Sequence, residues 1–325
     1  MQIPAPLRDL GIDRAHAWAI PMTTRFRRIE VRDGLLLHGP AGWAEFSPFW
    51  DYDAPESSAW LRAALEDATL ERPVPLREEI EVNATIPVVQ PALAARIARV
   101  GGARTAKVKV ADPGSDLAAD AARLEAVRDS LGPSARIRID ANAAWTLDEA
   151  RAALPLLDRA AGGLEYAEQP CAALEDLAAL RRELDVPIAA DESVRRAEDP
   201  LRVARAEAAD LLVMKVQPLG GVRRCLELAE QAGLPVVVSS AIESSLGLSA
   251  GLALAAALPR LEHACGLGTA TLLTGDLVTD PLRARDGRIP VERPVPDEDL
   301  LTRHAAPPAL AAAWEQRLAE CADLL

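Results

Sequence analysis

The sequence predicts an α/β protein: a modified (β/α)8-type barrel with an α+β capping domain formed from the N-terminal region and the C-terminal tail. From about residue 82, short β-branched runs alternate with longer segments of helical apolar spacing, and the unit recurs about every 23 to 31 residues. Eight strands alternating with helices are typical of such a barrel. The pattern of the first 80 or so residues instead predicts antiparallel strands followed by a helix.

The predicted barrel strands are short apolar runs. They lie at residues 82–89, 105–111, 136–142, 164–170, 187–193, 211–217, 235–241 and 263–268. One intervening helix begins with Thr146 and Glu149, which predict a capping box. The apolar run from Leu246 to Leu258 is shorter than the roughly 20 residues of a membrane span, so we interpret it as a buried helix of the barrel. A doubly wound sheet is the alternative, but no glycine-rich nucleotide loop follows a strand.

The capping domain is predicted from both ends of the chain. Residues 24–49 predict two or three antiparallel strands with turns at Asp33–Gly34 and Gly39–Gly42. Residues 53–70 predict a helix, and residues 307–325 predict a second helix after a proline-rich linker. We therefore expect a cap at 1–81, completed by 291–325, and a catalytic barrel at 82–290.

The composition argues against two kinds of partner, nucleic acids and membrane surfaces. The net charge is −13, which disfavours nucleic acid and membrane surfaces as general partners because both are polyanionic. The negative charge does not exclude a small-molecule carboxylate as the substrate. The composition does not decide between a monomer and a homo-oligomer. We expect no signal peptide, because no apolar segment follows a basic start in the first residues. We expect free thiols in a cytoplasmic enzyme, because no zinc or disulfide spacing relates the cysteines, which are Cys171, Cys225, Cys265 and Cys321.

Lysine is almost absent from the chain. Only three of the 36 basic residues are lysines, namely Lys107, Lys109 and Lys215. Arginine stays protonated at ordinary pH, whereas a lysine amine can lose its proton when its surroundings lower its pKa. All three lysines lie in strand-like apolar runs, so we predict that they act in proton transfer.

Three consecutive predicted strands each end in a carboxylate: Asp140, Glu168 and Asp191. The active site of a barrel lies at the carboxyl ends of its strands, so these acids would meet there. Clustered carboxylates repel one another, and a hard divalent cation removes that conflict. The set predicts a Mg²⁺ or Mn²⁺ site, although any one of the acids alone could be a helix cap or a surface ion-pair partner.

The lysines flank this predicted metal site. Strands two and six lie on opposite sides of a barrel, so Lys109 and Lys215 could face each other across a substrate. Lys107 has the same inward parity as Lys109, and two neighbouring amines would lower each other's pKa. Arg138 would add another cation. A metal with opposed lysines suits removal of a proton next to a carboxylate. Further polar side chains follow the strands: Asn142, Ser239, Ser240, Glu243 and Ser244.

The motifs AKVKV, RIDANAAW, YAEQP, ADES and LLVMK, in this order, resemble the enolase superfamily, and among its members the muconate-lactonizing group. WAEFSPF, DANAAWT, SSAIESSLGL and CGLGTATLL are similar to the o-succinylbenzoate synthases of that group, particularly the actinobacterial type. The resemblance covers nearly the whole chain, including the cap.

This resemblance implies a metal-dependent syn-dehydration of 2-succinyl-6-hydroxy-2,4-cyclohexadiene-1-carboxylate in menaquinone biosynthesis. Lys109 would remove the α-proton and then protonate the departing hydroxyl, while Lys215 would stay charged. The three acids would bind Mg²⁺. Ser239, Ser240 and the Ser244–Ser245 region would bind anionic groups of the substrate, and the loop at Met22 to Arg25 would contact its succinyl arm.

Other functions stay open at this point. N-succinylamino acid racemisation uses a similar scaffold with the same two lysines, alone or as a second activity. A Schiff-base aldolase using Lys215 and a barrel that has lost its chemistry are more remote alternatives. A histidine-dependent racemase is disfavoured because the four histidines do not follow the sixth or seventh strand, and His263 is expected to have a structural role.

Overall fold

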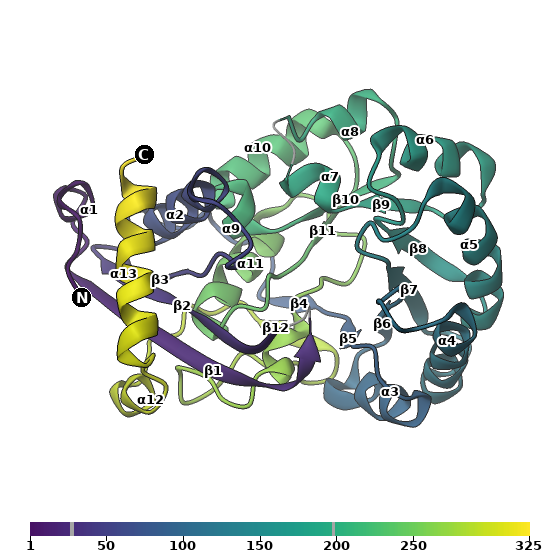
Figure 1. Cartoon of the computed structure of the whole chain (residues 1–325), viewed down its shortest axis with the longest axis horizontal. Helices are drawn as coiled ribbons and strands as arrows, with labels where there is room; N and C mark the ends of the chain where they lie inside the picture. The colour runs from purple at the N-terminus through teal and green to yellow at the C-terminus, as the bar shows by residue number, and fades with distance from the viewer. Residues whose placement is uncertain (27–28, 197–198) are drawn as a thin grey trace.

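The computed structural model describes residues 1–26, 29–196 and 199–325. Figure 1 shows a barrel beside a smaller cap, with both chain termini in the cap. The cap contains a short helix α1 (Ala5–Asp9) and an antiparallel sheet in the order β1-β2-β3, formed by β1 (Arg14–Phe26), β2 (Ile29–Gly39) and β3 (Gly42–Phe46). Helices α2 (Ala54–Thr69) and α13 (Pro308–Ala322) confirm the two helices predicted for the cap.

The cap strands correct one predicted turn. A turn at Gly39–Gly42 is confirmed between β2 and β3, but Asp33 and Gly34 lie inside β2, paired with Ala19 and Trp18 of β1. The β1–β2 connection includes residues 27–28, outside the described part of the chain. Gly34 serves packing instead, because a Cβ at that position would lie 2.6 Å from the Cβ of Ser47 and 3.1 Å from the Trp18 ring.

We therefore expect Gly34→Ala to destabilise the cap by about 1–3 kcal/mol, since an added methyl in a close-packed region forces its neighbours to shift. Chemical denaturation would measure the free energy of unfolding. Gly34 is not at a positive φ, so the loss would report packing and not backbone strain. A free energy of unfolding within about 0.5 kcal/mol of wild type would contradict this packing role.

The barrel contains a seven-stranded parallel sheet in the order β11-β10-β9-β8-β7-β6-β5. The predicted eighth strand is reduced to two bridges. Cys265 pairs with Val82 next to one edge of the sheet, and Gly266 pairs with Ser239 next to the other, so these two residues join the edges. The strands are β5 (Ala84–Ile86), β6 (Thr105–Lys109), β7 (Arg136–Asp140), β8 (Leu164–Glu168), β9 (Ile188–Ala190), β10 (Leu211–Met214) and β11 (Val236–Val238).

Helices follow the strands around the barrel. Thr146 and Glu149 form the predicted capping box, and nearly every residue of the predicted apolar helix is buried. In the described chain, no helix is both long and apolar enough to cross a membrane. The barrel helices are α3 (Pro91–Ala98), α4 (Leu117–Leu131), α5 (Leu147–Ala161), α6 (Leu174–Glu183), α7 (Glu192–Arg195), α8 (Arg202–Arg205), α9 (Val216–Leu219), α10 (Val222–Ala232) and α11 (Ser245–Ala257). Helix α12 (Glu298–Arg303) lies beside α13 in the cap. Short 3-10 turns occupy Val100–Gly102 and Gly268–Leu272, and β4 (Glu79–Glu81) pairs with β12 (Arg288–Pro290).

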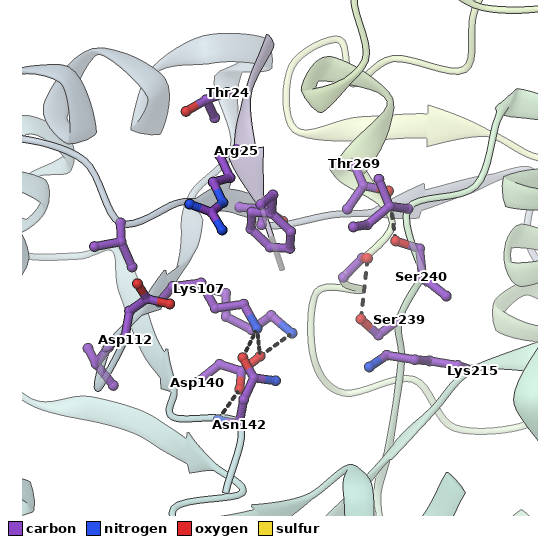
Figure 2. A pocket seen from close by; sticks show the side chains of 18 of the residues that line it. Thr24, Arg25, Lys107, Asp112, Asp140, Asn142, Lys215, Ser239, Ser240 and Thr269 are labelled. Atoms are coloured by element: carbon purple, nitrogen blue, oxygen red, sulfur yellow. Dashed lines mark hydrogen bonds and ion pairs between the residues drawn. The ribbon is translucent and has the colours of Figure 1, made fainter. Parts of the chain in front are cut away.

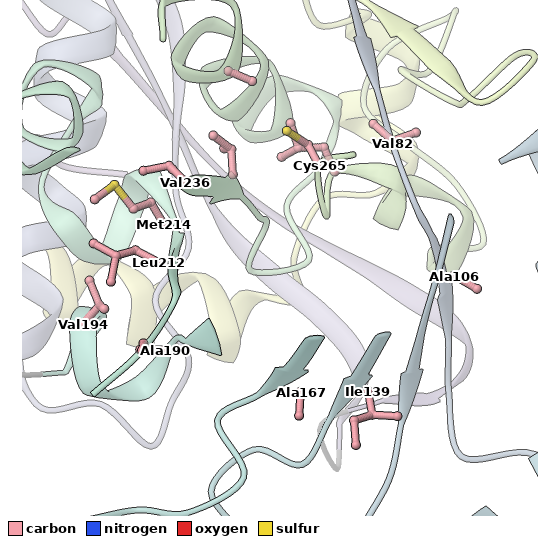
Figure 3. Close-up of a cluster of buried hydrophobic side chains, with 14 of the residues drawn as sticks. Val82, Ala106, Ile139, Ala167, Ala190, Val194, Leu212, Met214, Val236 and Cys265 are labelled. Atoms are coloured by element: carbon pink, nitrogen blue, oxygen red, sulfur yellow. The ribbon is translucent and has the colours of Figure 1, made fainter. Parts of the chain in front are cut away.

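Two large apolar clusters stabilise these parts. Figure 3 shows part of one of them, which joins strand residues such as Ile139, Ala167 and Leu212 with helix residues such as Val194. The other centres on Trp18 and Trp314 of the cap. Full burial of one large apolar side chain contributes roughly 1.5–3 kcal/mol, so each cluster can stabilise its own unit. The domain boundaries at 81/82 and 290/291 stay a prediction.

Candidate active site

Side chains alternate along the barrel strands, and this alternation directs the charged ones inward. On β6 and β7, every second residue is apolar and packs in the core shared with the helices. The charged residues between them therefore point into the barrel. The outward set is Ala106, Val108, Ile137 and Ile139, and the inward set is Lys107, Lys109, Arg138 and Asp140.

The strand register brings the predicted acids and lysines to one rim. Lys109 is level with Asp140, and Asp140 is level with Glu168. Asp191 and Lys215 directly follow the next two strands, β9 and β10. All three carboxylates are at most 1% exposed. The rim therefore carries a lysine pair, three consecutive carboxylates and a third lysine, in that order around the sheet.

A cavity of about 390 Å³ opens at this rim. Figure 2 shows Lys107, Asp140 and Asn142 on one side, Lys215 with Ser239 and Ser240 on the other, and Arg25 of the cap above them. Lys109 also lines the cavity. Thr24 and Arg25 line the cavity, but the segment from Met22 to Arg25 is part of strand β1 and not a loop as predicted, and Met22 is buried in the cap cluster.

Each buried acid is paired with a cation. Lys107 Nζ lies 2.9 and 3.0 Å from the Glu168 oxygens, and Lys109 Nζ lies 2.5 Å from Asp140 Oδ2. Asp191 accepts hydrogen bonds from Lys215 at 2.5 Å and from Arg195 at 2.9 Å. Among the described residues, no group of three or more histidine, cysteine, aspartate or glutamate side chains is arranged to hold a metal ion.

The chemistry of the three acids nevertheless fits a divalent cation. Burial and the charge of Asp140 raise the pKa of Glu168 to about 7. Burial would also raise the pKa of Asp191, but Arg195 and Lys215 lower it to about 2. For Asp140, Lys109 and Lys107 outweigh burial, so its pKa is also lowered. These carboxylates thus depend on nearby positive charge, and oxygen-only donors suit Mg²⁺ or Mn²⁺.

One electrostatic expectation is wrong for Lys107. Adjacent lysines were predicted to lower each other's pKa. Burial does lower the pKa of Lys107, but Glu168 and Asp140 outweigh burial and raise it above its ordinary value. The carboxylates decide the result because they contact Lys107 directly, so Lys107 stays protonated and balances the acid cluster.

Five predicted site residues are not among those that line the cavity: Arg138, Glu168, Asp191, Glu243 and Ser244. For Arg138, Glu243 and Ser244, a role in supporting the residues that bind substrate stays a prediction. Arg138 has the inward parity of Asp140 but lies two residues earlier, about 7 Å along the strand. It is fully buried deeper in the barrel, where its Nε donates to Glu165 at 2.5 Å. His263 binds the same glutamate at 2.9 Å, which confirms its structural role.

Glu243 and Ser244 instead belong to a buried network between cap and barrel. Glu45 of β3 accepts hydrogen bonds from Ser244 N at 3.0 Å and Ser244 Oγ at 2.5 Å. Burial and the charge of Glu243 raise the pKa of Glu45 from its ordinary 4.5 to about 7, although Arg32 opposes this shift. Folding therefore favours the protonated form of Glu45.

This shift predicts a pH-dependent stability. Between pH 5 and 8 the unfolded chain releases the Glu45 proton more readily than the folded chain, so this residue lowers the free energy of unfolding as pH rises, until about pH 7. We expect Glu45→Gln to flatten that decline in denaturation experiments at pH 5, 6, 7 and 8. Glu230→Gln on the exposed face of α10 is the control. Equal pH slopes for wild type and Glu45→Gln would contradict the assignment.

Several residues of the site were missed from the sequence. Phe26 lies with its ring 5.4 Å from Lys109 Nζ, and Phe49, inside the quoted WAEFSPF motif, also lines the cavity. Arg195 follows Asp191 by four residues, a helical spacing that could have suggested their pairing. Gln169 of the EQP motif accepts hydrogen bonds from Asp191 N and Ser193 N, and so holds the loop after β9.

Backbone strain gathers at the same rim. Positive φ angles occur in non-glycine residues shortly after β6, β7, β8 and β11, namely at Ala111, Asn142, Ala143, Gln169 and Ile242. Such conformations cost energy and persist where surrounding contacts hold them, most often at functional sites. Their position independently favours this rim as the active site.

Comparison with known proteins agrees with this geometry. Residues 91–297 match the family described as Enolase C-terminal domain-like, and residues 17–68 match Enolase N-terminal domain-like. The chain is 57% identical over 303 residues to an o-succinylbenzoate synthase of Thermobifida fusca, covering 93% of this chain and 94% of that protein. It is 51% identical to an o-succinylbenzoate synthase of Mycolicibacterium smegmatis, covering 98% of both.

A solved structure supports the fold. The chain resembles 2-chloromuconate cycloisomerase from Rhodococcus opacus with a TM-score of 0.76 and 22% identity, covering 91% of this chain and 100% of that one. At this identity the likeness concerns the architecture of cap and barrel alone.

Proposed function

This chain belongs to the o-succinylbenzoate synthases of the enolase superfamily, and we propose how its own residues carry out their dehydration reaction. It is an enzyme, a carbon–oxygen hydro-lyase that acts on a small molecule and depends on a divalent metal. The substrate is 2-succinyl-6-hydroxy-2,4-cyclohexadiene-1-carboxylate and the product is 2-succinylbenzoate. We further propose that the reaction serves menaquinone biosynthesis in the cytoplasm.

The observation that carries the mechanism is the order of charges around the rim. Lys109 and Lys215 line the same cavity, and the strands between them end in Asp140, Glu168 and Asp191. These acids would hold Mg²⁺ or Mn²⁺, which supplies the positive charge that acidifies the carbon next to the substrate carboxylate. Lys109 and Lys215 would then lie on opposite faces of the substrate ring.

Lys109 acts as base and then as acid. Its amine takes the α-proton, and the C–H electrons move into the carboxylate to give an enediolate. When the ring C–O bond breaks, the same amine returns its proton to the departing hydroxide, and water leaves from the face on which the proton was removed. Lys215 remains an ammonium ion and stabilises the enediolate from the other face. Net loss of one water makes the ring aromatic, which drives the reaction forward.

The cavity wall would orient the substrate. Ser239 and Ser240 offer hydroxyls next to Lys215, and Arg25 offers a cation from the cap. A carboxylate on the succinyl arm would pair with Arg25 by charge-assisted hydrogen bonds, which are stronger than neutral ones. Phe26 would shield the Lys109 amine from water at the same end of the cavity.

A direct assay tests this function. Purified protein with Mg²⁺ and the cyclohexadiene substrate should show the ultraviolet change of ring aromatisation. A chelator should stop it, and added Mg²⁺ or Mn²⁺ should restore it. Absence of turnover, together with α-proton exchange of N-succinylamino acids in deuterated water, would overturn the dehydration in favour of racemisation.

A further inference from the structure

The loop between β11 and α11, residues 239–244, forms one wall of the cavity. Ser239, Ser240, Ala241 and Ile242 all line it. The position of the two serine hydroxyls relative to Lys215 therefore depends on the backbone conformation of this loop. Whatever holds that conformation also holds the substrate-binding wall.

Ile242 makes the conformation costly. Its φ is +64°, a region that a β-branched residue rarely adopts. Such a conformation is strained and persists only where its surroundings enforce it. The neighbours of Ile242 are thus expected to include a group that fixes its peptide.

Arg32 of the cap is such a group. It is 2% exposed, and its Nε donates a hydrogen bond to the carbonyl of Ile242 at 3.1 Å. The rest of the guanidinium is itself held: Nη1 donates to the Asp33 carbonyl at 2.8 Å, and Nη2 donates to Ser47 Oγ at 2.9 Å. The guanidinium carbon, Cζ of Arg32, lies 4.5 Å from the centre of the Phe49 ring, and Phe49 also lines the cavity.

The loop is anchored on both sides of Ile242. Glu243 Oε2 accepts a hydrogen bond from Ala241 N at 2.6 Å, and Glu45 of the cap binds Ser244 and accepts from Gly247 N at 3.3 Å. Arg32 contacts the carbonyl of the strained residue itself. Because its guanidinium is planar and held at three points, it fixes the direction of the Ile242 carbonyl.

We propose that Arg32 is a positioning residue for the dehydration: from the cap, it holds the Ile242 peptide and keeps the 239–244 loop in the conformation that binds substrate. The role rests on the proposed function but not on substrate contact, because Arg32 does not line the cavity. It couples the docking of the cap to the shape of the wall formed by the barrel.

The first test is Arg32→Met. We expect KM to rise about tenfold or more, and the Kd of the product 2-succinylbenzoate by calorimetry to rise in parallel, while kcat changes less, because the loop binds substrate and the lysines do the chemistry. Arg32→Lys retains charge and a donor, so it should fold well and show an intermediate KM. Arg77→Met is the matched control, since Arg77 binds the carbonyls of Leu258 at 2.5 Å and Pro259 at 3.2 Å, just beyond the C-terminal end of α11. It should lower the melting temperature without changing KM.

The second test is a double-mutant cycle with Ile242→Gly. Glycine adopts positive φ readily, so the loop would keep its conformation without the arginine. The tenfold effect of Arg32→Met on KM should shrink to about twofold or less in the Ile242→Gly background. An equal effect in both backgrounds, or a loss of stability with unchanged KM, would overturn the proposal. A wild-type chain without turnover would contradict the proposed function instead, so the two failures are distinguishable.

Discussion

Lys109→Met is expected to lower kcat for dehydration by about 10³- to 10⁴-fold. A positioned general acid–base contributes typically 10²–10⁴-fold, and here one amine serves both proton transfers. The fold should survive, because Asp140 keeps a second cation in Lys107, whose Nζ lies 3.6 Å from Asp140 Oδ2. Ultraviolet kinetics would give kcat, and thermal denaturation would report the fold.

Lys109→Arg distinguishes proton transfer from charge. Arginine keeps the positive charge beside Asp140 but cannot release its proton at ordinary pH, so this variant should be nearly as inactive as Lys109→Met. A Lys109→Arg enzyme with more than about a tenth of wild-type kcat would exclude Lys109 as the base. It would indicate instead that the site needs only a cation at this position.

Glu168→Gln should remove both metal binding and activity. Glu168 is the middle acid of the three and is fully buried. Loss of groups that merely support a metal ligand weakens metal binding 10–100-fold, so loss of a ligand is expected to weaken Mg²⁺ binding by at least about 100-fold. Calorimetric titration with Mg²⁺ would measure this directly, without reference to turnover.

Glu165→Gln supplies the control on the same strand. Glu165 pairs with Arg138 and His263 deeper in the barrel, away from Asp140 and Asp191, so its loss should lower stability but leave Mg²⁺ affinity unchanged. Wild-type Mg²⁺ affinity in Glu168→Gln would contradict the assignment of the three acids as ligands.

The order of strands and the residues at their ends could be predicted from the sequence, because both depend on local pattern. Alternation of apolar and charged residues places Lys109 and Asp140 inside the barrel, and the strand count then brings Glu168 and Asp191 to the same rim. The same local reasoning was wrong for Gly34. A glycine after an aspartate is typical of a turn, but here it makes room for Trp18, a contact that depends on how β1 pairs with β2.

Features that depend on depth or on contact between domains were not predictable. Arg138 and Asp140 share inward parity, and only the structure shows that the former lies deeper and pairs with Glu165. The raised pKa of Lys107 depends on direct contact with acids from other strands. Arg32 and Ile242 are 210 residues apart, and no periodicity in the chain relates them.

The cap is assembled from both ends of the chain, and this has a consequence for folding during synthesis. Trp314 of α13 donates a hydrogen bond to Asp33 of β2 at 2.7 Å, and Trp18 of β1 pairs with Ala305. The ribosome makes β1 and β2 first and α13 only after the whole barrel, while domains fold as their residues emerge. Trp314 can therefore pack against Phe46 of β3 only after the barrel has been synthesised. A chain stalled before α13 would leave this apolar contact surface open to chaperones and proteases.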